Sequence, residues 1–349
     1  MAKSNHAPRA GAAGAAPVVV IGASAGGGDA LSALLAQLRP DFPAPILIVQ
    51  HMAATASTAT QIRLLTRNSA LPCKAGEDGE LPLPGHVYLP TPDHHLMLSE
   101  GRMRVTKGAR ENRARPAIDA LFRSAAVSHG NRVIAVILSG YLDDGTSGME
   151  AVHRCGGLCV VQDPVDASYP DMPQNVINNA WVDKCVALAD MGPLLLKLAG
   201  RKRGKRKAVP ADVAIESKIA ERVLSDLESV EALGTLVPFN CPGCGGVLWE
   251  VGKAGQLRYR CHTGHAYTAG ELLADQTQKM EETLWVALRM FEENRNLLVK
   301  MRSEGIGNPA YGERIDQSAI HIGRIRAMLN GDTSDPDAQV KKKPRITRK

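Results

Sequence analysis

The sequence of 349 residues is long enough for one large domain and a smaller one. Hydrophobic residues make up 44% and charged residues 22%, which is typical of a globular protein, and no run approaches the ~18 apolar residues that span a membrane. The net charge of +6 arises from two basic runs, residues 201–207 and 341–349, and the rest of the chain is acidic. We therefore expect solvated charge runs, no membrane span and no specific nucleic-acid partner.

The N-terminal residues 1–16 are rich in Ala, Gly and Pro and lack the apolar core of a secretory signal, so they predict a disordered leader. The seven cysteines are odd in number and unevenly spread, which does not resemble a secreted disulfide framework. We therefore expect a cytoplasmic protein.

From Val18 onward, short apolar runs alternate with stretches of helical periodicity. The apolar runs predict strands over 18–21, 46–49, 133–138 and 158–161, and the periodic stretches predict helices over 29–38, 57–67, 116–127 and 147–154. Residues 81–106 alternate apolar and polar positions and predict hairpin-like strands. This order indicates an α/β domain over 17–200 with a mostly parallel sheet and helices on both faces.

The remainder of the chain predicts a second, mixed region. A basic linker over 201–211 leads to residues 212–330, and a basic disordered tail is expected over 331–349. Within the second region we expect a helix over 214–230, a cysteine-rich module over 240–267, a long helix over 269–303 and a shorter helix over 311–329.

Three reactive residue types follow predicted strands. Ser24 follows the first strand, His51 follows the second, and Asp144 lies in the loop after 133–138. Because the carboxyl ends of parallel strands meet at one edge of a sheet, these residues can converge. Their types match a nucleophile, a base that takes its proton, and a carboxylate that orients the base.

The segment Gly22-Ala-Ser-Ala-Gly26 matches the G-x-S-x-G turn, and the helix after it offers N–H groups to an oxyanion. Other interpretations remain open: Ser24 as a helix N-cap, His51 as a loop histidine, and Asp144 as a turn residue. A nucleotide-binding loop is a further alternative, although no G-x-G-x-x-G and no Walker lysine is present.

A set of ordered motifs carries a family resemblance, namely VVVIGASAGGGDAL, ILIVQHM, ENRARPAIDALFRSAA, VILSGYLDDGTSGM, GGLCVVQDP and DMPQNVI. From about residue 17 to 199 the chain resembles the catalytic domain of the chemotaxis protein-glutamate methylesterase CheB. The resemblance implies a doubly wound sheet in three α/β/α layers. It also implies Ser24 as nucleophile, His51 as general base and acid, Asp144 as orienting carboxylate, and an oxyanion hole from the backbone N–H groups of Ala25 and Tyr141.

The sequence departs from the family pattern at several points. Ala25 replaces a common Thr, Tyr141 replaces Met, and Leu142 replaces a Gly. Asp143 is adjacent to Asp144, which leaves a one-residue alternative for the carboxylate, although the spacing to the following Gly favours Asp144. The best-known members carry an N-terminal receiver domain, so here we expect control from residues 201–349 or from a partner.

The resemblance implies hydrolysis of glutamate γ-methyl esters on chemoreceptors, the methyl-accepting chemotaxis proteins, to glutamate and methanol. It also implies deamidation of receptor glutamine, and catalysis without a cofactor. The alternative of a different class is a catalytically silent signalling scaffold that acts through the C-terminal region. In either case the C-terminal helices are candidates for binding a signalling partner.

A second motif lies in the cysteine-rich module. Cys241 and Cys244 form a C-x2-C pair, and Cys261 and His265 follow after sixteen residues, with His262 as a competing fourth ligand. Four N and S ligands suit tetrahedral Zn²⁺, and 247–260 predicts a hairpin that brings the two halves together. We expect a structural zinc ribbon; a small packed hairpin with free thiols is the alternative.

Overall fold

The computed structural model describes residues 16–51, 56–221, 227–252, 257–306, 308 and 310–331. The chain divides into two compact units, one ending at Leu272 and the other beginning at Leu273. The predicted leader and tail lie outside the described residues, except for residues 16 and 331.

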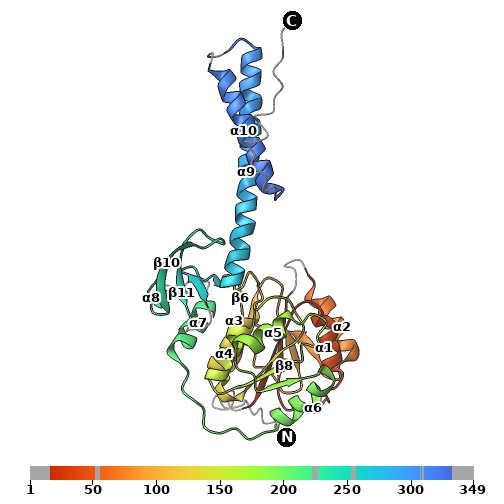
Figure 1. Ribbon diagram of the computed structural model, residues 1–349. Coiled ribbons are helices and arrows are strands. Elements are labelled where there is room, and N and C mark those ends of the chain that lie inside the picture. Colours follow the sequence, from red (N-terminus) through yellow and green to blue (C-terminus); the bar gives the residue numbers. More distant parts are fainter. Residues whose placement is uncertain are drawn as a thin grey trace, which may run out of the picture. The chain divides into compact units, whose positions relative to one another are not determined.

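The centre of the first unit is a seven-stranded parallel sheet (Figure 1). Its strands are β1 (Val18–Ala23), β2 (Ile46–Gln50), β3 (Cys73–Ala75), β4 (Val87–Leu89), β7 (Val133–Ile137), β8 (Leu158–Gln162) and β9 (Lys184–Val186). They lie in the order β3-β4-β2-β1-β7-β8-β9. The chain builds outward from β1 first through β2 and later through β7, so the strand order reverses at β1. This reversal is where open α/β sheets bind ligands.

Helices cover both faces of the sheet, as predicted. One face packs on α1 (Gly27–Leu35), α2 (Thr58–Asn68) and α6 (Leu188–Ala199). The other packs on α3 (Ile118–His129), α4 (Thr146–Arg154), α5 (Asp171–Asn179) and the antiparallel hairpin of β5 (His95–Ser99) and β6 (Arg102–Thr106). A short 3-10 turn, Gly130–Arg132, precedes β7. Because side chains alternate along a strand, Val18 and Val20 face α3 whereas Val19 and Ile21 face α1.

The predicted elements of this domain are largely confirmed, with one correction. Residues 81–106 were expected to form hairpin-like strands, but β4 within them pairs in parallel with β2 and β3, and only β5 and β6 form the hairpin. The sequence patterns missed β3 and β9, which have three residues each, and the helices α5 and α6. Three-residue strands are too short for a periodic signal, and Pro193 interrupts the helical pattern of α6.

The first unit also holds a smaller antiparallel sheet, which we call the ribbon sheet. It consists of β10 (Gly234–Asn240), β11 (Val247–Val251), β12 (Arg258–Cys261) and β13 (Ala266–Thr268), and two helices precede it, α7 (Ala211–Glu221) and α8 (Leu227–Glu231). The predicted hairpin over 247–260 corresponds to β11 and β12, in which Trp249 pairs with Arg260. Leu248, Tyr259 and Tyr267 form its small core.

The long helix α9 (Ala269–Ser303) begins in the first unit and continues in the second, where α10 (Tyr311–Leu329) packs against it. Leu288 of α9 contacts Ile322 and Ile325 of α10, and Arg326 pairs with Glu292 at 2.6 Å. Both helices match their predicted ranges. Among the described residues, no helix combines the length and apolar character that a membrane span requires.

Candidate active site

Ser24 and His51 occupy neighbouring positions at the carboxyl edge of the sheet. Ala23 pairs with Gln50 in the parallel register of β1 and β2, and the His51 N–H donates to the Ala23 carbonyl at 3.0 Å. Ser24 and His51 are therefore the next residues along two adjacent strands. On the other side, the Ser24 N–H donates to the Ser139 carbonyl at 3.0 Å, which ties the end of β1 to the loop after β7.

Two glycines allow the chain to turn closely around Ser24. Gly26 has a φ of 69°, a left-handed conformation that glycine adopts without a steric penalty, and it forms the N-cap of α1. A Cβ atom on Gly140 would lie 2.8 Å from Ser24 Cβ and 2.5 Å from Met172 Cε. Only glycine therefore lets the loop after β7, which continues into Tyr141, come this close to Ser24.

The structure brings Asp144, and not its neighbour Asp143, to the histidine. His51 Nε2 lies 2.7 Å from Asp144 Oδ2. Asp143 instead hydrogen-bonds Thr268, and burial raises its pKa. With Nε2 donating to the carboxylate, His51 Nδ1 is the ring nitrogen left to accept a proton.

Asp144 is buried and accepts hydrogen bonds on both oxygens. Besides His51, the Ile118 N–H donates to Oδ2 at 2.7 Å, while the Asp119 N–H and Asn112 Nδ2 donate to Oδ1 at 3.1 and 2.9 Å. Burial alone would raise the pKa of Asp144, but His51 and these donors outweigh it and hold the pKa below its usual range. Asp144 is therefore a fixed anion that can orient His51 and stabilise its charged form.

Two further residues support this carboxylate and were not singled out from the sequence. Asn112 Nδ2 donates at 2.9 Å both to Asp144 Oδ1 and to Asp119 Oδ2. Asp119 Oδ1 accepts from the Gly145 and Gly148 N–H groups at 3.0 and 2.6 Å. Burial, followed by the charge of Asp144, raises the pKa of Asp119 to about 7. Both residues lie in the segment ENRARPAID, which the sequence marks only through its resemblance to the family pattern.

The four predicted metal ligands also come together. The ligand atoms of Cys241, Cys244, Cys261 and His265 lie within 4.8 Å of one another, and His262 is not part of this group. Each half is a tight turn: the Gly245 N–H donates to Cys241 O at 2.7 Å, and the Gly264 N–H donates to Cys261 O at 3.0 Å. Both glycines have positive φ, 77° and 100°, as such turns require.

The spacing of the sulfur and nitrogen atoms fits zinc. Zn–S bonds of ~2.3 Å and Zn–N bonds of ~2.05 Å at tetrahedral angles place two sulfurs about 3.8 Å apart and a sulfur and a nitrogen about 3.6 Å apart. Cys244 Sγ lies 3.7 Å from Cys261 Sγ, and Cys261 Sγ lies 3.5 Å from His265 Nδ1. These two distances and the donor set of three sulfurs and one nitrogen fit tetrahedral zinc.

The model of the family described as CheB methylesterase matches residues 19–195, just over half of the chain. The chain belongs to the CheB methylesterase family. A crystal structure of the Thermotoga maritima CheB methylesterase catalytic domain is similar, with a TM-score of 0.50 and 34% identity, over 52% of this chain and 98% of that domain. The α/β fold predicted from the sequence is thus confirmed.

Curated relatives carry two activities in their names. Protein-glutamate methylesterase/protein-glutamine glutaminase 4 of Myxococcus xanthus is 41% identical over 179 residues, which is 51% of this chain and 50% of the relative. A Leptospira interrogans protein, named provisionally for the same two activities, is 36% identical over 52% of this chain and 93% of its own length. A Xanthomonas oryzae relative is 37% identical over 53% of this chain and 52% of its own length. The chain thus spans about half the length of the Myxococcus and Xanthomonas relatives.

The loop in which this chain departs from the CheB pattern keeps the unusual backbone of a glycine. Leu142 replaces the Gly and adopts a φ of 65°, and its carbonyl accepts from Asn175 Nδ2 at 2.8 Å. Tyr141 is half exposed and packs edge-on against Tyr169, with ring centroids 4.7 Å apart. Leu142 therefore holds a left-handed backbone, which a glycine adopts without penalty, at a cost in strain.

Proposed function

We propose that the chain is a serine esterase that hydrolyses glutamate γ-methyl esters on chemoreceptors, with Ser24, His51 and Asp144 as its catalytic residues. The observation that carries the proposal is the 2.7 Å contact between His51 Nε2 and Asp144 Oδ2, at the strand edge where Ser24 and His51 are adjacent. A receptor of the methyl-accepting class is the proposed substrate because the curated relatives are named for protein-glutamate methyl esters.

The proposed reaction follows from the hydrogen bond between His51 Nε2 and Asp144, which leaves His51 Nδ1 to accept a proton. Ser24 Oγ attacks the γ-carbonyl carbon of the glutamate ester while His51 Nδ1 takes the hydroxyl proton. Asp144, held ionised, stabilises the imidazolium that forms. Backbone N–H groups of Ala25 and Tyr141 are the proposed donors to the oxyanion, and each such donor is worth about 3–4 kcal/mol in comparable sites.

The second half of the reaction uses the same groups. His51 returns the proton to the ester oxygen, so the acyl–oxygen bond breaks and methanol leaves. A water molecule then attacks the acyl-enzyme and gives a proton to His51. His51 passes this proton to Ser24 Oγ as the acyl–Oγ bond breaks, which releases glutamate and regenerates Ser24. A receptor glutamine would form the same acyl-enzyme with ammonia as the leaving group, which is why we include deamidation in the proposal. Catalysis by these residues requires no cofactor.

Methanol release from methylated receptor membranes tests the proposed activity. We expect the wild-type chain to release methanol and Ser24→Ala to release none above the uncatalysed level. An absence of methanol from the wild type with several receptors would instead favour a silent scaffold that acts through the C-terminal region.

We also propose that Cys241, Cys244, Cys261 and His265 hold a structural zinc ion, on the strength of their spacing. Metal analysis of the purified chain is expected to give one zinc per chain, and Cys244→Ser should lower that content. A zinc content near zero after growth with zinc would contradict this proposal.

The proposed location is the cytoplasm, which is supported by the seven cysteines, none of which forms a disulfide bond. A signalling partner that binds the C-terminal helices also remains a proposal. It is supported by the exposed apolar side chains of Val286, Met290 and Leu297 on α9.

A further inference from the structure

The ribbon sheet contacts the loop that supports the active-site carboxylate. Ala266, the first residue of β13, is next to the proposed ligand His265. Its N–H donates to Arg110 O at 3.3 Å, and its carbonyl accepts from the Asn112 N–H at 2.8 Å. Glu111 thus forms an isolated parallel β-bridge with Ala266. The loop that contains Glu111 is therefore paired with the first residue of β13.

The residue that β13 holds by its backbone is the one that holds Asp144 by its side chain. Asn112 Nδ2 donates to Asp144 Oδ1, while Asp144 Oδ2 faces His51. Asn112 and Arg113 have φ values of 49° and 62°, in the left-handed region that non-glycine residues rarely adopt. Such a conformation persists only where surrounding contacts fix it, and the Ala266 bridge supplies two of them.

Buried ion pairs made by the Glu111 side chain fix the same loop. Glu111 accepts from Arg260 of β12 at 2.8 Å and from Arg123 of α3 at 3.0 Å, and these three side chains are at most 1% exposed. Arg260 also donates to Gly264 O at 2.9 Å, within the turn between the proposed ligands Cys261 and His265.

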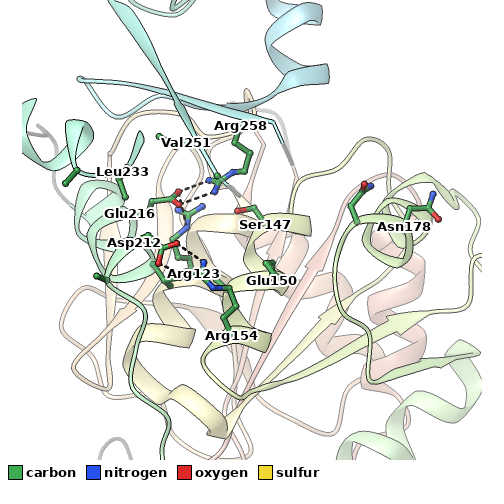
Figure 2. A pocket seen from close by; sticks show the side chains of 16 residues that line it. Arg123, Ser147, Glu150, Arg154, Asn178, Asp212, Glu216, Leu233, Val251 and Arg258 are labelled. Atoms are coloured by element: carbon green, nitrogen blue, oxygen red, sulfur yellow. Dashed lines mark hydrogen bonds and ion pairs between the residues drawn. The ribbon is translucent and has the colours of Figure 1, made fainter. Parts of the chain in front are cut away.

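The network extends to α7. Glu216 pairs with Arg258 of β12 at 2.7 Å and with Arg123 at 3.6 Å. Figure 2 shows Arg258, Glu216 and Arg123 converging between the ribbon strands and α4, with the Arg154–Asp212 pair beside them. A buried charged side chain is costly without its ion-pair partner. These ion pairs therefore fix how the ribbon sheet packs against the catalytic domain.

We propose that the ribbon sheet is a positioning element of the active site. In this account β12 and β13 hold Glu111 and Asn112, and Asn112 then aims Asp144 at His51. Asn112 does not touch the substrate and acts only through Asp144. The inference rests on the proposed esterase function and on the proposed zinc site. Because the proposed ligand His265 directly precedes Ala266, loss of the zinc would loosen the Asn112 loop and lower the activity.

The first test removes only the side-chain link. In the full chain, Asn112→Ala is expected to lower kcat by about 10- to 100-fold, as loss of outer-shell partners does elsewhere, with KM changed less than about twofold. The rate at which a fluorophosphonate labels Ser24 should fall by a similar factor. The downfield NMR signal of the His51 Nε2 proton should broaden or shift, whereas a role in packing alone would leave that signal in place.

The second test breaks the link at the ribbon. Arg260→Met removes one partner of Glu111 but leaves Arg123 in place, and Arg260→Lys keeps the charge if the first variant fails to fold. We expect Ser24 to be labelled more slowly in both variants, with the larger effect in Arg260→Met. Leu236→Ala is the matched control, because Leu236 lies on β10 of the same sheet with 62% exposure and should leave labelling unchanged.

The third test removes the metal. Chelation that strips zinc, followed by metal analysis, should slow Ser24 labelling about tenfold, and added zinc should restore it. In Asn112→Ala the same treatment should have a much smaller effect, because both changes act through one residue.

The outcomes separate the inference from the esterase proposal. Asn112→Ala with unchanged kcat, labelling rate and His51 signal would overturn the positioning role. A chain that binds no zinc, or one whose labelling is indifferent to zinc, would overturn the metal link. If the wild type releases no methanol but its Ser24 labelling and His51 signal still depend on Asn112, the receptor esterase proposal fails and the positioning role stands.

Discussion

The Asp144→Asn variant probes the active-site geometry most sharply, because the four groups that hydrogen-bond this carboxylate within the described part of the chain are all donors. His51 Nε2 and the Ile118 N–H face Oδ2, and Asn112 Nδ2 and the Asp119 N–H face Oδ1. An asparagine has one oxygen and one NH2 group in these two places. In either orientation of the amide, its NH2 group therefore meets two N–H donors.

Both orientations have a calculable cost. If the NH2 group faces His51, the ring must take its other tautomer, with the proton on Nδ1, which can then no longer accept a proton from Ser24. In Ser-His-Asp enzymes this change lowers kcat by about 10⁴-fold, or about 5.4 kcal/mol. If the NH2 group faces Asn112 and Asp119 instead, the Asn112 Nδ2 and Asp119 N–H donors lose their acceptor. Each such loss costs about 1–3 kcal/mol in stability. We expect the catalytic loss to dominate the measured phenotype.

Methanol release and urea unfolding of the full chain check this prediction together. Asp143→Asn is the matched control, because Asp143 contacts Thr268 and not His51, and it should keep activity within a few-fold of wild type. Asp144→Asn with activity within tenfold of wild type would refute the geometric reasoning. Loss of activity in Asp143→Asn with retention in Asp144→Asn would move the carboxylate role to Asp143.

Three other substitutions give independent predictions. Leu142→Gly relieves the left-handed strain at φ 65° and should raise stability by up to about 1 kcal/mol in urea unfolding; a loss would contradict the strain argument. Gly140→Ala places a methyl group 2.8 Å from Ser24 Cβ, so stability should fall by about 1–3 kcal/mol and Ser24 labelling by at least tenfold, whereas Gly323→Ala, with open space around it, should cost nothing. Burial, and then the charges of Asp143 and Asp144, raise the pKa of Glu271 from 4.5 to about 7. The folded state therefore favours its protonated form, and this stability is present below pH 4.5 and lost as the pH rises through 7. In Glu271→Gln, the fall in the free energy of unfolding between pH 4.5 and 8 should be about 3 kcal/mol smaller than in the wild type. A stability–pH profile identical to that of the wild type would contradict this prediction.

The parts of the site that the sequence could predict share a simple geometric origin. Ser24, His51 and Asp144 each follow an apolar run, and parallel strands bring their carboxyl ends to one edge whatever the details of packing. The choice between Asp143 and Asp144 rested on the spacing to Gly145, and the structure brings Asp144 to His51. The four proposed zinc ligands could also be predicted from the sequence, because two tight turns define their spacing.

The contacts that the sequence could not predict depend on tertiary packing. Asn112 lies in a loop without periodicity, and its two carboxylate partners are 7 and 32 residues away along the chain. The Glu111–Arg260 pair joins residues 149 positions apart, and the sequence gives no signal for such a pairing. The docking of the ribbon sheet on the active-site loop therefore depends on tertiary contacts that no local sequence pattern predicts.

Covalent labelling of Ser24 by a fluorophosphonate, mapped by mass spectrometry, tests the central arrangement most directly, since it requires an activated hydroxyl and no knowledge of the receptor. We expect one modified peptide, containing Ser24, in the wild type, and labelling at least a hundredfold slower in His51→Gln. Labelling at a different serine, or labelling of Ser24 that is equally fast without His51, would contradict the account.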